Sequence, residues 1–389
     1  MYSGKWFVQM SMILLLFSGL RSQWQEVAVE QEIAGMDVPA QVEMFNPRFH
    51  FPPVNQDTTS ICWSFSTISF IETEMYRLGL PPVKLAVVYP VYYTFIEKAR
   101  AFVRSKGTSR FEPGDLFSSV YEIVNKYGIV PESVYRGRSE TRKTYNHDSL
   151  YAELKTCMAS VKKEAEWDEA KAVTRVSDIL NRHLGSPPST FEYEGKSYTP
   201  VSFLNERVKL PWHDYLVVTS FIYAPYDSFC VLKVPDNWRN NEKYFNVTLP
   251  VFYQNLVTAL KKGYSVAIDG DIGEPGRYGI SDVAFIPSFD IAPGDIDQTA
   301  REYRFDKGLT TDDHLMHIVG FTRKDSLDWF LVKDSWRDAW EGEQKGYFFY
   351  RGDFVKLKVL AYLVHRDAVP DIVARIPEGL SISIMKPFP

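Results

Sequence analysis

The stretch NQDTTSICWSF, residues 55–65, joins a short polar segment to the start of a predicted helix. Apolar residues recur behind it at helical spacing: Phe65, Ile68, Ile71 and Met75. Capping residues at 58–60 and a stop at Gly79 predict a helix from Thr58 to Leu78. Because apolar side chains fill several of its faces, we expect this helix to be buried at the centre of the fold.

Cys62 lies near the predicted start of this helix. Unpaired N–H groups and the helix dipole stabilise an anion there, which favours a thiolate. Gln56, six residues earlier, offers a side-chain amide. Together with the backbone N–H of Cys62 it could hold an oxyanion, at about 3 kcal/mol per donor. The plain alternative is that Cys62 is an ordinary core residue.

The spacing of Gln56 from the Cys62-Trp63 pair resembles the nucleophile motif of papain-like cysteine peptidases. Residues 311–321, TDDHLMHIVGF, are similar to the histidine strand of that family. His314 lies six residues before Gly320, as in the family, so the resemblance assigns the catalytic imidazole to His314. His317 is on the opposite face of a strand and is interpreted as a packed or supporting histidine.

Residues 333–336, KDSW, resemble the Lys-Asn-Ser-Trp segment of the same family. Asp334 stands where the family has the asparagine that orients the imidazole, and a carboxylate can do the same work. The alternative is an exposed aspartate in a turn. By the same resemblance Trp336 shields the hydrogen bond and borders the substrate, and Gly114 meets the substrate backbone.

Further segments resemble the bleomycin hydrolase and aminopeptidase C branch: residues 127–135, 184–191, 199–203 and 263–271. Three positions depart from the family pattern. Ser60 and Pro113 stand where relatives have glycine, and Arg337 replaces the glycine after the tryptophan. The tail from Asp371 to Pro389 shows no match, so cleavage at chain ends versus internal cleavage stays open.

The order of patterns, helices first and short strands last, predicts an α+β fold. Helices are expected at 87–103, 116–127 and within 150–184, and strands at 215–223, 264–268, 314–321, 329–333, 347–350 and 359–365. The resemblance implies a papain-like plan, in which a helical subdomain carrying the nucleophile helix packs against an antiparallel β-barrel-like subdomain, with a long insertion. We expect six parts: a signal peptide at 1–22, a lead-in at 23–52, a helical subdomain at 53–143, an insertion at 144–262, a β subdomain at 263–366 and a tail at 367–389.

The 389 residues are 45% hydrophobic and carry a formal net charge of -5, which argues against a nucleic-acid partner. Lys5 precedes a short, mostly apolar run that ends near Ser22. This pattern is typical of a secretory signal peptide. We therefore expect export to a periplasm or to the medium, with an uncleaved anchor as the alternative membrane attachment.

The chain has three cysteines, Cys62, Cys157 and Cys230, and an odd number leaves at least one thiol unpaired. Cys157 and Cys230 are expected to be separate thiols, with a disulfide between them as the alternative. No metal-binding spacing is present, and residues 269–280 lack the final glutamate of a calcium loop. We expect no metal and no cofactor.

These residues predict hydrolysis of peptide bonds through a Cys62 thioester, and the partners are expected to be peptide substrates. One alternative is a degenerate relative that keeps the fold and grips peptides without cutting them. Another is acyl transfer to an amine in place of water. The sequence does not decide the oligomeric state.

Overall fold

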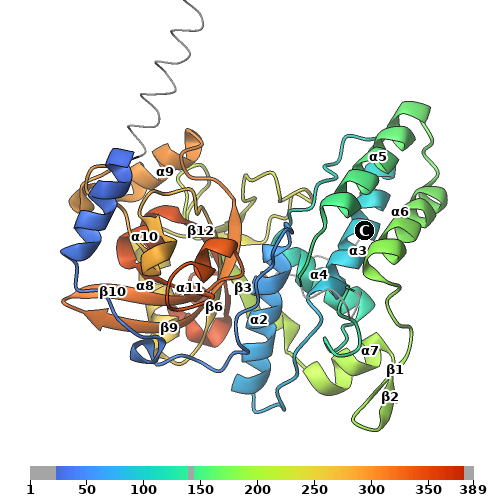
Figure 1. The fold of residues 1–389 in the computed structure, drawn as a ribbon, viewed down its shortest axis with the longest axis horizontal. Helices are drawn as coiled ribbons and strands as arrows, with labels where there is room; N and C mark the ends of the chain where they lie inside the picture. Colours follow the sequence, from blue (N-terminus) through green and yellow to red (C-terminus); the bar gives the residue numbers. More distant parts are fainter. Residues whose placement is uncertain (1–22, 139–143, 381–389) are drawn as a thin grey trace, which may run out of the picture.

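The computed structural model describes residues 23–138 and 144–380. Figure 1 shows helices α3 to α6 gathered on one side of the molecule and the main sheet on the other, with α2 between them. The predicted signal peptide at 1–22 and the end of the predicted tail lie outside the described residues. Within the described ranges, no helix is long and apolar enough to cross a membrane.

The predicted central helix is α2. The next two predicted helices are α3 and α4, and each of these two begins one residue later than expected. The predicted helical region 150–184 is two helices, α5 and α6, because Ala165 turns into the left-handed region and Asp168 caps a new start. The helices are α2 Cys62–Arg77, α3 Val88–Arg104, α4 Phe117–Tyr127, α5 Asp148–Glu164, α6 Glu169–Leu184, α7 Pro200–Phe203, α8 Leu249–Lys261, α9 Gln298–Asp306, α10 Gly352–Lys358 and α11 Pro370–Val373. Short 3-10 or π turns are η1 Val42–Phe45, η2 Leu204–Val208, η3 Trp212–Asp214, η4 Gly279–Ser281, η5 Pro293–Asp295, η6 Arg337–Trp340 and η7 Arg366–Ala368.

Ten strands form one sheet in the order β4-β5-β3-β12-β6-β9-β10-β11-β8-β7, beside a separate β1–β2 hairpin. The strands are β1 Phe191–Tyr193, β2 Lys196–Tyr198, β3 Tyr215–Thr219, β4 Ser228–Cys230, β5 Tyr244–Asn246, β6 Val266–Gly270, β7 Arg277–Tyr278, β8 Val283–Ala284, β9 His314–Lys324, β10 Leu327–Lys333, β11 Tyr347–Arg351 and β12 Val359–His365. The fold is therefore α+β, as predicted.

The expected antiparallel pairing of the β subdomain at 263–366 is wrong at β8–β11, which is parallel, and the pair β3–β5 in the segment 144–262 is also parallel. Both pairs are joined by long connections that carry the chain back to the same end of the sheet, which is what a parallel pair requires. Strands β3, β4 and β5 come from the segment predicted as an insertion, yet they extend the same sheet through β12.

Helix α2 packs on one face of the sheet. All of its residues from Cys62 to Met75 are buried, which confirms the predicted central helix. Alternating residues of β6 and β9 divide the core: Ala267 and Leu315 join the α2 side, and Ile268 and Met316 join the side covered by α8 and α10. The hydroxyl of Ser66 donates to the carbonyl of Met316 at 2.6 Å. This contact fixes α2 against β9, the two elements that carry the predicted catalytic residues.

Candidate active site

Helix α2 begins at Cys62 itself, so the expected capping by residues 58–60 is wrong. Its N-cap is Ile61, which has no capping side chain. Thr59 instead donates its hydroxyl to the carbonyl of Gln56 at 2.8 Å. The first N–H groups of α2 are therefore left without a side-chain cap, and they can stabilise negative charge at the Cys62 sulfur.

His314 is the first residue of β9, and the structure brings it to Cys62. The imidazole is 1% exposed and hydrogen-bonds both the Cys62 thiol and Asp334, the latter at 2.8 Å between Nε2 and Oδ1. Burial alone would lower the pKa of His314, but the negative charges of Asp334 and Cys62 raise it to about 9. The imidazole is therefore protonated at neutral pH, and its positive charge faces the Cys62 sulfur.

Asp334 follows β10 and is buried, which excludes the alternative of an exposed turn residue. Its Oδ1 also accepts a hydrogen bond from the backbone N–H of Trp336 at 2.7 Å, and its Oδ2 accepts one from the Arg277 guanidinium at 2.6 Å. Burial opposes ionisation, but His314 and Arg277 hold the pKa of this carboxyl well below its usual range. The Trp336 ring lies 6.0 Å from the His314 ring, centroid to centroid, beside the bond it was predicted to shield.

Arg277 lies on β7 and is buried, and it was not expected from the sequence. Its guanidinium also pairs with Asp338 and donates to the Tyr350 hydroxyl at 3.1 Å. A signal for it was available, because an aspartate at a position that relatives fill with a neutral asparagine needs a compensating charge when it is buried.

Replacing Arg277 with methionine is expected to lower the free energy of unfolding by about 3–5 kcal/mol, because the buried Asp334 charge loses a partner. Arg323→Met is the matched control: its ion pair with Asp328 is 59% exposed on the arginine side, and we expect a change within about 1 kcal/mol. Urea unfolding of both variants measures the difference. Equal losses for the two variants would contradict the stabilising role of Arg277.

Gln56 is fixed beside the same strand end. Its side-chain oxygen accepts a hydrogen bond from the Ser335 hydroxyl at 2.8 Å, and its backbone N–H donates to the Ser335 carbonyl at 2.8 Å. The side-chain nitrogen donates to the Thr59 carbonyl at 2.8 Å. Because an amide nitrogen carries two hydrogens, one donor is left for a substrate oxygen.

A surface groove runs beside this site and is lined in part by Ser60, Tyr151, Trp336 and Arg337. Tyr151 comes from α5 and was not predicted; its hydroxyl hydrogen-bonds the backbone of Ser60, and the charge on Cys62 acts on it. Arg337 is exposed at the rim. The two departures from the family pattern at Ser60 and Arg337 therefore both border the groove.

Gly114 lies close to the nucleophile helix, because the carbonyl of its neighbour Pro113 accepts a hydrogen bond from the Trp63 indole at 3.1 Å. The space where a Cβ of Gly114 would project is already filled: Oδ2 of Asp236 lies 1.9 Å from that point. The Lys98 ammonium donates to the Gly114 carbonyl at 2.5 Å. Contact between Gly114 and the substrate backbone stays a prediction, and Asp236 is an unexpected neighbour.

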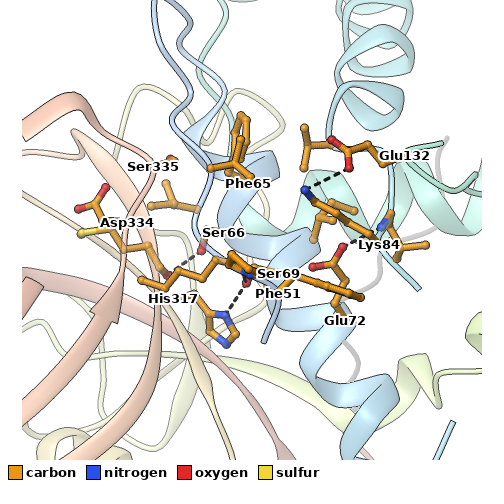
Figure 2. A pocket seen from close by; sticks show the side chains of 18 of the residues that line it. Phe51, Phe65, Ser66, Ser69, Glu72, Lys84, Glu132, His317, Asp334 and Ser335 are labelled. Atoms are coloured by element: carbon orange, nitrogen blue, oxygen red, sulfur yellow. Dashed lines mark hydrogen bonds and ion pairs between the residues drawn. The ribbon is translucent and has the colours of Figure 1, made fainter. Parts of the chain in front are cut away.

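His317 lines a small cavity between α2 and the sheet (Figure 2), and Cys62 is not among the residues that line it. Its Nδ1 lies 2.9 Å from the Ser69 hydroxyl, which also accepts from Lys333 at 2.8 Å. Burial and the charge of Lys333 lower the pKa of His317 well below its usual value, so the ring stays neutral. Burial also raises the pKa of Glu72 to about 7 in this cavity. The packed position fits the interpretation made from the sequence.

All three cysteines are free thiols, so the alternative disulfide between Cys157 and Cys230 does not form in the structure. Within residues 23–138 and 144–380, no three His, Cys, Asp or Glu side chains are grouped so that they could hold a metal ion.

Comparison with known proteins places these residues in a wider context. The model of the Peptidase C1-like family matches residues 25–387. Aminopeptidase C of Lactobacillus delbrueckii subsp. lactis is 22% identical over 369 residues, covering 82% of this chain and 81% of the relative. Bleomycin hydrolase of Gallus gallus is 22% identical over 382 residues, covering 84% and 83%. The crystal structure of pepw from Lactobacillus rhamnosis HN001 superposes with a TM-score of 0.64 at 19% identity, covering 96% of this chain and 95% of that one.

Proposed function

Because this chain belongs to the Peptidase C1-like family and is a cysteine peptidase, we propose that it hydrolyses peptide bonds through a thioester on Cys62 and acts as an aminopeptidase. One observation carries the assignment of roles: His314 lies between the Cys62 thiol and the Asp334 carboxylate and hydrogen-bonds both. A degenerate relative that only grips peptides has no need to keep this charged, fully buried arrangement.

The proposed reaction has two steps. The Cys62 thiolate attacks the carbonyl carbon, and the oxyanion accepts hydrogen bonds from the Gln56 amide and the Cys62 backbone N–H. His314 gives its proton to the departing amine, which leaves a thioester. The neutral imidazole then takes a proton from water, the hydroxide equivalent attacks the thioester, and Cys62 leaves as the thiolate. Asp334 keeps the ring in position and stabilises the imidazolium, and Trp336 limits the access of water to this bond.

Three further expectations belong to the same proposal. Residues 1–22 act as a signal peptide, and the protein is exported. The chain divides into a helical subdomain at 53–143, an insertion at 144–262 and a barrel-like β subdomain at 263–366. The partners are peptides, which are held in the groove beside Trp336.

The reaction is tested by incubating the protein with a mixed peptide library and measuring the products by mass spectrometry. We expect single residues to be removed in turn from the amino terminus, because the relatives that share most of the chain length include enzymes named aminopeptidase C. Products cut at internal bonds would contradict the aminopeptidase assignment. An unchanged library would contradict hydrolysis itself.

A further inference from the structure

Tyr151 brings a hydroxyl group to the groove beside the catalytic residues, and the reaction described above gives it no part. The start of its helix, α5, is tied to the loop that precedes Cys62. The backbone N–H of His147 donates to the Thr58 carbonyl at 3.0 Å, and the N–H of Thr58 donates to the Tyr145 carbonyl at 3.3 Å. Tyr151 follows His147 by one helical turn, with its N–H 2.9 Å from the His147 carbonyl. Backbone pairing therefore sets where the phenol lies.

The groove reaches the catalytic residues. Ser60, Tyr151 and Trp336 line it together, and the Tyr151 side chain is partly exposed. Ser60 precedes Cys62 by two residues. The Trp336 ring lies 6.0 Å from the His314 ring, centroid to centroid. A molecule held in this groove therefore contacts the nucleophile loop, the indole and the phenol.

The proton of His147 can be placed from the contacts of its ring. His147 is 3% exposed, and its Nδ1 lies 3.2 Å from the Tyr151 hydroxyl oxygen. The other ring nitrogen, Nε2, has no hydrogen-bond partner among the described residues. Burial lowers the pKa of His147 to about 4, so at neutral pH the ring carries one proton. Because a buried N–H without an acceptor is rarer than a buried lone pair without a donor, we place this proton on Nδ1.

The hydroxyl proton of Tyr151 is then free to point into the groove. The Nδ1–H group of His147 donates to the phenol oxygen, and the backbone N–H of Ser60 acts on the same atom. A hydroxyl group has two acceptor lone pairs and one donor, so the contacts from these two N–H groups leave the donor unused. Burial raises the pKa of Tyr151 well above its usual value, so the phenol keeps its proton. The groove therefore presents an O–H donor to a bound molecule.

The departing segment of the substrate is the part that fits this groove. In the proposed reaction His314 gives its proton to the departing amine, so the chain beyond the cleaved bond starts at the imidazole. Trp336 borders both that imidazole and the groove. The groove lining carries charges of both signs, from Asp57, Asp148 and Arg337. A neutral backbone carbonyl, which every departing peptide carries, is therefore the acceptor that suits the phenol.

We propose that the Tyr151 hydroxyl, oriented by His147, donates a hydrogen bond to the first carbonyl oxygen of the departing segment. The bond holds the segment beside Trp336, so that the amine stays within reach of the His314 proton. A substrate in which another residue follows the cleaved bond is therefore preferred to a simple amide of the same amino acid. This inference rests on the proposed function and adds a contact on the departing side of the substrate.

Replacing Tyr151 with phenylalanine removes the hydroxyl and keeps the ring. We expect kcat/KM to fall about tenfold for tri-alanine, whose departing segment has a carbonyl, and to stay within about twofold for alanine p-nitroanilide, whose departing amine has none. Product formation is followed by mass spectrometry for the peptide and by absorbance for the anilide. Equal losses on the two substrates, or no loss on tri-alanine, would overturn the proposal.

Binding separates this inference from the proposed function. In the Cys62→Ala variant, adding Tyr151→Phe is expected to weaken the binding of tri-alanine about tenfold and to leave that of alanine p-nitroanilide within about twofold, as measured by calorimetry. Unchanged affinity for tri-alanine, or no binding of it, would contradict the hydrogen bond. If the wild-type protein cut neither substrate, the proposed function would fail, and this titration would still decide the inference.

Tyr303→Phe is the matched control, because Tyr303 is 58% exposed on α9, on the other side of the molecule from α5 (Figure 1). We expect it to leave both substrates unchanged. His147→Leu should cost about threefold on tri-alanine, since the hydroxyl loses the group that orients it, and His147→Gln should restore the rate because its amide N–H can donate in place of Nδ1. Thermal unfolding checks that each variant folds. Equal effects of leucine and glutamine on tri-alanine would contradict the orienting role of His147.

Discussion

Peptide hydrolysis is expected to fall by a factor on the order of 10⁴ or more when Cys62 is replaced by alanine. The reaction proposed here forms a covalent bond to the sulfur, which alanine cannot form. The oxyanion donors at Gln56 and the α2 terminus stay in position, so some acceleration over water is retained. Release of a fluorescent amine from an aminoacyl amide measures the loss, at enzyme concentrations high enough to detect the residual rate.

Cys157→Ala is the matched control for this experiment. Cys157 is also a buried, free thiol on a helix, α5, but it lies away from His314. We expect its replacement to leave hydrolysis within about twofold of wild type and to cost stability only through lost packing. If Cys62→Ala retained wild-type activity, the thioester mechanism would be excluded.

Replacing Asp334 with asparagine is expected to move the alkaline limit of activity downward by about 1–2 pH units. His314 has a raised pKa of about 9, so the protonated imidazole persists up to that pH and activity declines as the pH rises through it. Asparagine can still orient the ring but supplies no negative charge, so His314 loses its proton at lower pH. The rate is measured as kcat/KM between pH 5 and pH 10.

Asp338→Asn is the control for the pH profile, because Asp338 pairs with the same Arg277 but does not touch His314. Its replacement is expected to leave the alkaline limit where it is. A shift of equal size in both variants would mean that the Arg277 network sets the limit, and not the direct Asp334 contact. Asp334→Ala, which also loses the orienting hydrogen bond, is expected to cost on the order of 10³-fold in kcat/KM.

The sequence predicted the structure best where the apolar spacing of a helix or strand and a catalytic motif fall in the same segment. Helical spacing behind Cys62 predicted α2, and short apolar runs predicted β9, β10 and β12 close to their observed limits. The segment around His314 predicted that this residue lies beside Cys62 and Asp334, although about 250 positions separate the cysteine from the histidine. These predictions succeeded because each motif lies within a single element or at its end.

Contacts made only by folding could not be predicted. Arg277 reaches Asp334 from a two-residue strand in a turn-rich region, which has no periodicity to mark it. Helix α8 was not predicted within the segment assigned to the insertion, although Pro250 in its first turn is a common signal of a helix start. The start of α2 at Cys62 was misplaced by four residues because the hydroxyls before it bond to a local loop instead of capping the helix.

The central claim is that the His314 imidazolium keeps Cys62 as a reactive thiolate, and alkylation of the three cysteines tests it within one protein. Burial raises the pKa of Cys157 and raises that of Cys230 to about 11, so both should react slowly with iodoacetamide at pH 7. We expect peptide mass spectrometry to find Cys62 alkylated at least about a hundredfold faster than either, with the rate preserved at pH 6 and lowered in His314→Ala. A Cys62 that reacts no faster than Cys230 in the wild-type protein, or equally fast without His314, would contradict the account.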